Sequence, residues 1–194
     1  MTSYLCNTGI LIGLFFTLHA EAASHEPAES LPSNSIYHLS IALEDQDGVS
    51  AGLDQFRGNA VLVTMFYANC PHVCPLLIST IKLTEAALTN SQRSRLRILA
   101  ISVDPERDTP EFLQTTMRRH DVDSSRWSMV RPNPTDLRAI AGVLGTKYKQ
   151  LPNGEFSHNT RIVLVNELGS PIADSSQLGR IDEAFLAAIK KSLP

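Results

Sequence analysis

The stretch AVLVTMFYANCPHVCP, residues 60–75, decides the fold class of this chain. Its first eight residues, 60–67, are a continuous apolar run rich in β-branched and aromatic side chains. Such a run is typical of a central strand that is buried on both faces of a sheet. The sequence therefore predicts a buried strand that leads directly into a loop carrying two cysteines.

The two prolines of that loop indicate where the next helix begins. Pro71 disfavours helical conformation at Cys70, and Pro75 has no amide hydrogen, so it is tolerated only in the first turn of a helix. We therefore expect a helix that begins at Val73 or Cys74, with Cys70 on the loop just before it.

The rest of the chain alternates strand and helix patterns. Further strands are predicted at residues 37–43, 96–103 and 161–166. Further helices are predicted to open at residues 108–111 and to cover residues 134–144 and 182–193. This alternation predicts an α/β sandwich with a largely parallel central sheet, whose functional site lies at the carboxyl ends of the strands.

Composition excludes several classes of protein. The 194 residues fit one domain, and 43% hydrophobic and 19% charged residues rule out a disordered, collagenous or coiled-coil chain. Three cysteines are too few for a disulfide-stapled scaffold. A net charge of −3 gives no basic surplus for binding nucleic acid.

Residues 1–22 predict a secretory signal peptide, because the apolar run 9–18 is followed by the A-x-A-like Ala20-Glu21-Ala22. An uncleaved N-terminal anchor stays open, since no Lys or Arg precedes the run, although a spanning helix needs about 20 apolar residues. Residues 23–35 predict a flexible leader and residues 36–194 the folded domain. The chain is thus expected to be exported.

The cysteine spacing allows several chemistries. Cys70 and Cys74 both lie near a helix N-terminus, which favours thiolate over thiol. Even in a full helix their Cα atoms would be only about 6 Å apart, within range of a disulfide or of one shared metal ion. The motif is C-x-x-x-C and not the C-x-x-C of thioredoxin-type redox proteins. A plain structural disulfide is the alternative.

Two cysteines rarely complete a metal site alone, so a third ligand is needed. His158, in the polar loop 154–160 before a buried strand, is the best candidate. Two thiolates and one imidazole form a soft set that selects Cu(I) over hard cations. His72, between the cysteines, is either an accessory ligand or a solvated side chain.

The motif Cys70-Pro71-His72-Val73-Cys74-Pro75 resembles that of the Sco/SenC family of copper-binding, thioredoxin-fold proteins. Residues 101–110, ISVDPERDTP, are similar to the second signature of that family, and residues 158–165 to the segment with its ligand histidine. The resemblance runs from about residue 37 to residue 193. It implies a thioredoxin-like sandwich with a mixed, mostly parallel sheet flanked by helices, and copper, as Cu(I) or Cu(II), on Cys70, Cys74 and His158.

The resemblance also implies two functions for the cysteine pair. In the first, the protein is a copper chaperone that assists cytochrome c oxidase assembly in the periplasm or at the outer face of the inner membrane. Its partner is then the copper-receiving subunit of a respiratory oxidase. In the second, Cys70 and Cys74 form a reversible disulfide and reduce the partner's cysteines. A thiol peroxidase is disfavoured, because Val63 and Tyr67 occupy the Pro and Thr positions of that pattern.

Other polar groups have plainer interpretations. A strand exit followed by a helix cap is favoured over a metal cluster for Asp104, Glu106 and Asp108. A solvated face is favoured over a docking patch for Arg118, Arg119 and Arg126. Trp127 and Met129 are expected in the core.

Overall fold

The computed structural model describes residues 30–193, and Leu31 begins its compact unit. The predicted signal peptide or anchor, and most of the predicted leader, lie outside the described residues. None of the helices within residues 30–193 has the length and apolar character needed to cross a membrane.

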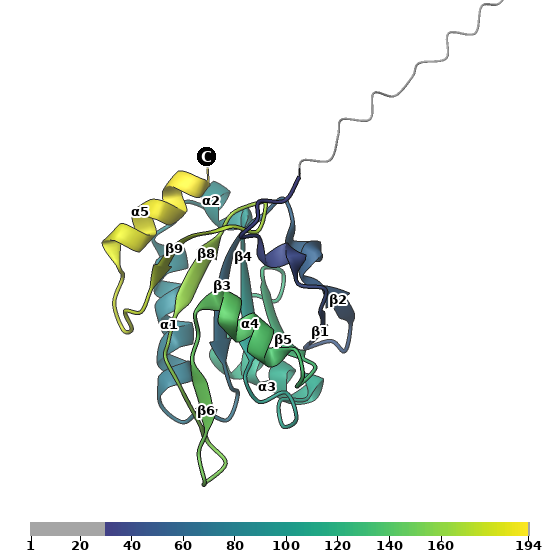
Figure 1. Ribbon diagram of the computed structural model, residues 1–194. Helices are drawn as coiled ribbons and strands as arrows, with labels where there is room; N and C mark the ends of the chain where they lie inside the picture. Colours follow the sequence, from purple (N-terminus) through teal and green to yellow (C-terminus); the bar gives the residue numbers. More distant parts are fainter. Residues whose placement is uncertain (1–29, 194) are drawn as a thin grey trace, which may run out of the picture. The chain divides into compact units, whose positions relative to one another are not determined.

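A seven-stranded sheet forms the centre of the domain, with the order β2-β1-β5-β4-β3-β8-β9 (Figure 1). Its strands are β1 (Ala42–Asp45), β2 (Ser50–Gly52), β3 (Ala60–Phe66), β4 (Leu96–Ser102), β5 (Trp127–Pro132), β8 (Ile162–Val165) and β9 (Pro171–Ser175). Strands β3, β4 and β5 are parallel neighbours. All other pairings in this sheet are antiparallel. The mixed sheet flanked by helices confirms the fold class, but parallel pairing is confined to the centre, because hairpins form both edges.

Helices cover both faces of this sheet. They are α1 (Val73–Ala86), α2 (Asn90–Ser94), α3 (Pro110–His120), α4 (Leu137–Leu144) and α5 (Glu183–Ser192). Figure 1 shows α4 in front of the sheet and α1 with α3 behind it. Two 3₁₀ helices, Ile36–His38 and Leu53–Phe56, complete the unit. Strands β6 (Tyr148–Gln150) and β7 (Phe156–His158) form a separate two-stranded hairpin.

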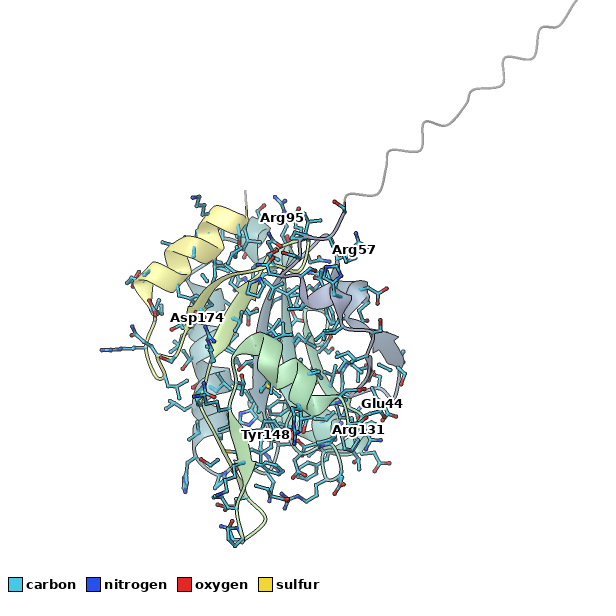
Figure 2. The ribbon with its side chains drawn as sticks, viewed as in Figure 1. Glu44, Arg57, Arg95, Arg131, Tyr148 and Asp174 are labelled. Atoms are coloured by element: carbon cyan, nitrogen blue, oxygen red, sulfur yellow. The ribbon has the colours of Figure 1, made fainter. Side chains whose placement is uncertain are left out.

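The predicted central strand is correct in position and burial. Every residue of β3 is buried, and the strand lies between β4 and β8. Beyond β4 in the strand order, an ion pair between Glu44 and Arg131, at 2.6 Å, joins β1 to β5 (Figure 2). The carboxyl end of β3, where the cysteine loop begins, is held by β4, which pairs with β3 as far as Phe66.

The segment predicted as a strand at residues 37–43 is wrong in its first half. Tyr37 lies in the 3₁₀ helix Ile36–His38, because the Ser35 side chain accepts a hydrogen bond from its backbone N–H at 3.2 Å. The strand begins only at Ala42. Asn34 and Ser35, at the end of the predicted leader, hydrogen-bond to residues 168–170, so they belong to the folded unit.

Candidate metal centre

Helix α1 begins at Val73, as its prolines predict, and this places both cysteines at its N-terminus. Cys70 is half-buried on the loop, and Cys74 is buried in the first turn, with 3% of its surface exposed. Both are free thiols. The junction thus presents one accessible sulfur and one enclosed sulfur.

Cys70 takes the place of a helix cap. The N-cap residue, His72, makes no capping hydrogen bond with its own side chain, but the backbone N–H of Cys74 donates to Cys70 Sγ at 3.4 Å. Burial alone would raise the pKa of Cys70. The backbone N–H groups of Cys74 and His72 outweigh burial, and the pKa of Cys70 falls below its ordinary value. The Tyr67 hydroxyl also hydrogen-bonds to the Cys70 sulfur and lowers this pKa further.

Cys74 has the opposite electrostatic character. Burial raises the pKa of its thiol far above the ordinary value, and the nearby negative charges of Cys70 and Asp108 raise it further. The two sulfurs of one motif therefore differ in both exposure and acidity. The lowered pKa favours the thiolate at Cys70, whereas the strongly raised pKa keeps the proton on Cys74.

Asp108 hydrogen-bonds to the start of the cysteine loop. Its Oδ2 accepts hydrogen bonds from the Ala68 N–H at 3.0 Å and the Ser102 hydroxyl at 2.5 Å, which ties the loop to the end of β4. Its Oδ1 is buried with no hydrogen-bond partner among the described residues. Burial raises the pKa of this carboxyl. Asp108 thus ties the end of β4 to the cysteine loop, while Thr109 caps α3, as the sequence predicts.

His158 lies at the end of β7 and not in a loop. The sequence-based expectation of a loop is corrected because Phe156 and Tyr148 pack against the core and allow two short strands to pair around the Gly154 turn. In the register of the hairpin, Tyr148 faces His158. Burial lowers the pKa of His158, so its imidazole is neutral at pH 7.

Tyr67 contacts both the cysteine loop and the hairpin that carries His158. Its hydroxyl meets the Cys70 sulfur, and its ring lies edge-on to His158 with centroids 6.2 Å apart. Phe156 packs against the same ring at 5.8 Å. Burial and the hydrogen bond to Cys70 raise the pKa of Tyr67 to about 12, so the phenol stays a donor. Sequence reasoning missed this residue, whose signal is its position as the last aromatic before the cysteine loop.

The three predicted ligands are not gathered around one point. Within residues 30–193, no group of three or more His, Cys, Asp or Glu side chains is arranged to hold a metal ion. Tyr67 contacts both Cys70, through its hydroxyl, and His158, through its ring. A metal bound by all three predicted ligands would therefore require the β6–β7 hairpin to move toward the helix.

The remaining predicted residues have structural places. His72 is exposed, and Asp104 is paired with Arg107. Trp127 and Met129 are buried, as predicted. The arginines differ from the expected common face: Arg126 is largely buried and bonds Glu85 and Asp123, Arg118 bonds Gln114 and Thr115, and Arg119 is exposed.

A thioredoxin-like sandwich with two free thiols where its buried β3 strand meets α1 defines a class of thiol proteins. The particular family follows from comparison. The sequence model of the SCO1/SenC family matches residues 33–193, and the chain belongs to that family. The signature residues 70–75 and 101–110 fall inside the matched segment.

Individual curated relatives match parts of the chain. The SCO1 protein homolog of Bacillus subtilis is 25% identical over 137 residues, which cover 69% of this chain and 70% of that protein. Other curated relatives are matched over smaller shares of their length, down to 35%.

Solved structures show the same fold. Bradyrhizobium japonicum ScoI with copper bound is 24% identical, with a TM-score of 0.64 over 79% of this chain and 97% of that one. BsSco, described as having a disulfide switch and as a member of the Sco family of cytochrome c oxidase assembly proteins, is 20% identical, with a TM-score of 0.66 over 78% and 90%.

Proposed function

We propose that this chain is an exported copper chaperone that carries copper on Cys70, Cys74 and His158 to a respiratory oxidase. The observation that carries the proposal is the cysteine pair: two free thiols at a helix N-terminus, one with a lowered pKa. Tyr67, which hydrogen-bonds to Cys70, also contacts the His158 imidazole, whose pKa is lowered by burial. Copper is the cargo of this protein.

The donor chemistry supports copper. Thiolate sulfur and imidazole nitrogen are soft ligands, which favour Cu(I) over Mg²⁺ or Ca²⁺. Metal binding needs deprotonated cysteine and neutral histidine, and the lowered pKa values of Cys70 and His158 favour those forms. Cys74, whose pKa is raised, must give up a proton, so binding is expected to release protons and to weaken as pH falls.

His158 is held in a form suited to coordination. Its Nδ1 lies 3.3 Å from the Asn159 carbonyl oxygen. A proton on Nδ1 donates to that oxygen and leaves the lone pair on Nε2 for a metal, which is how second-shell contacts orient histidine ligands. The hairpin must then move so that His158 approaches the cysteines.

The partner and the compartment follow from family and sequence. Membership in the SCO1/SenC family, together with a solved family member described as a cytochrome c oxidase assembly protein, supports the copper-receiving subunit of a respiratory oxidase as partner. The apolar run and A-x-A pattern of residues 9–22 support export to the periplasm or the outer face of the inner membrane.

The unequal thiols favour thiol–disulfide exchange as a second candidate function. The Cys70 thiolate would attack a partner disulfide, form a mixed disulfide and release one partner thiolate. Cys74, after losing its proton, would attack Cys70 Sγ and release the second partner thiolate. The partner gains two electrons, and Cys70 and Cys74 become a disulfide.

One pair of variants separates the two functions. His158→Ala removes a copper ligand but no sulfur, whereas Cys70→Ser removes both activities. Copper transfer to the purified copper-receiving subunit and reduction of its disulfide are measured anaerobically for each variant, with His72→Ala as the matched control. Delivery predicts that His158→Ala abolishes transfer and leaves reduction intact. Full transfer by His158→Ala contradicts the proposed ligand set.

A further inference from the structure

A groove runs from the cysteine pair along the outer side of α1 toward α3. Its first part is a cavity of about 240 Å³ lined by Cys70, Pro71, Cys74 and Pro75, and by Thr116, Arg119 and His120 of α3. Its second part, of about 390 Å³, is lined by Ser79, Lys82 and Leu83. Ile78 and His120 line both parts, so the two cavities adjoin.

The charge of this groove is one-sided. Arg119 is exposed and has no hydrogen-bond or ion-pair partner among residues 30–193. Lys82 adds a second cation, which donates to the His120 carbonyl at 2.8 Å and lies 3.8 Å from the exposed Asp121 carboxylate. No Asp or Glu lines either cavity. This local positive charge contrasts with the net charge of −3 of the chain.

The shape of the groove fits an extended chain. From Cys74 to Leu83 the helix rises about 14 Å, the length of about four residues of extended polypeptide. Leu83, beside the far end, is 46% exposed, and Pro71 and Pro75 line the near end. Apolar walls and two cations along a line favour a peptide that alternates acidic and apolar side chains.

We propose that this groove binds an acidic, extended segment of the copper-receiving partner protein and leads its metal-binding or disulfide-bonded sulfurs to Cys70. This inference rests on the proposed function, because it assigns a docking site to the partner which that function requires. Arg119 contacts the acidic side chain nearest the thiols, and Lys82 contacts the next one along the groove.

Arg118 provides a matched control. It precedes Arg119 on the same helix and carries the same charge, but it hydrogen-bonds to Gln114 and Thr115 and does not line the groove. Both arginines interact similarly with the C-terminal dipole of α3. Reversing either charge therefore changes net charge and helix electrostatics alike, and only Arg119→Glu changes the groove.

The test uses the reduced chain and two synthetic probes. The acidic probe is a peptide of about ten residues with Glu, Leu and one Cys, blocked as a mixed disulfide with thionitrobenzoate. The basic probe has Lys in place of Glu. Attack by Cys70 on the peptide sulfur releases coloured thionitrobenzoate, and Cys74 then releases the peptide thiol. Cysteine-free versions with a fluorophore report binding alone by anisotropy.

We expect the acidic probe to react about 10-fold faster than the basic one at low salt, with the difference shrinking at high salt. Arg119→Glu lowers the rate and the affinity for the acidic probes about 3–10-fold, and Arg118→Glu changes them less than 2-fold. Equal effects of the two substitutions, or no preference for the acidic probe, would contradict the proposal that the groove binds an acidic segment.

Two further measurements separate this inference from the proposed function. Copper affinity, measured against a chromophoric chelator, is expected to be the same for Arg119→Glu and the unmodified chain. Failure of the unmodified chain to bind copper contradicts the proposed function, while anisotropy still tests the groove. Sedimentation velocity of the chain alone then tests for self-association. Self-association that Arg119→Glu abolishes would mean that a second copy of the chain occupies the groove, and it would contradict the proposed partner segment.

Discussion

The cysteine loop and the β6–β7 hairpin bring their donors to the candidate site in different ways. The loop extends from β3, in which every residue is buried, and Asp108 ties it to β4. The hairpin has two strands of three residues each, whose residues are exposed or only partly buried. An isolated two-stranded hairpin is only marginally stable by itself.

This difference divides the candidate site into a fixed half and an adjustable half. The sulfurs are positioned by the core, so their geometry changes little when a ligand enters. His158 depends on the packing of Phe156 against the Tyr67 ring. Capture and release of a cargo ion are then expected to be controlled at the hairpin, while the thiols determine which metal is accepted.

The largest effect is expected for the fixed half. Cys70→Ser should lower Cu(I) affinity more than 100-fold, because losing a ligand costs more than the about 10–100-fold loss typical of an outer-shell partner. Competition with a chromophoric chelator measures it. Oxidation to the Cys70–Cys74 disulfide should have the same effect, since a disulfide sulfur carries no thiolate charge. Equal copper loading of oxidised and reduced protein would contradict this.

His158→Ala tests the adjustable half. We expect Cu(I) affinity to fall at least about 10-fold but less than for Cys70→Ser, because both soft sulfur ligands remain. The melting temperature should be unchanged, because a hairpin residue adds little to the core. His72→Ala is the control and should change affinity less than about 3-fold, since His72 is exposed on the helix cap. A larger loss of affinity for His72→Ala than for His158→Ala would indicate that His72, and not His158, is the ligand.

Asp108→Ala should lower the stability of the folded domain. It leaves the Ala68 N–H and the Ser102 hydroxyl without their buried acceptor, at a cost of about 1–3 kcal/mol in the free energy of unfolding. Denaturant unfolding measures this cost. Glu106→Ala, two residues earlier and exposed, should cost less than about 0.5 kcal/mol.

The smallest effect concerns the contact between the halves. Tyr67→Phe removes the hydroxyl that donates to Cys70, so the pKa of Cys70 should rise toward its ordinary value. The pH profile of Cys70 alkylation, followed by mass spectrometry, would shift to higher pH. Tyr37→Phe alters the other buried tyrosine with a pKa near 12 and should leave the profile unchanged.

The fixed half was predictable from the sequence, whereas the adjustable half was only partly so. The run of residues 60–67 and the position of Pro75 determine a strand and a helix start through local backbone rules, and both predictions are confirmed. The strand predicted at residues 37–43 fails because the Ser35 cap, a local side-chain contact, competes with the strand pattern. The hairpin was missed because three-residue strands give too short a pattern for periodicity to detect.

The candidate site shows the same limit. Spacing alone makes Cys70 and Cys74 candidates. His158 is proposed as the best third donor and is supported by the resemblance, since nothing in residues 154–160 demands a ligand. Tyr67 and Asp108 act through contacts between segments distant in sequence, with Asp108 reaching Ala68 across 40 positions. Such contacts depend on the order of strands in the sheet, which the strand patterns along the sequence do not determine.

The hydrogen bond from the Cys74 N–H to Cys70 Sγ has a consequence for the redox balance of the pair. A cap of this kind stabilises the thiolate and therefore the reduced form, and stabilising the reduced form of a dithiol raises its reduction potential. For a two-electron couple, about 1.4 kcal/mol corresponds to 30 mV. Helix α1 thereby resists oxidation of the sulfurs at its own first turn, and a disulfide, once formed there, is readily reopened.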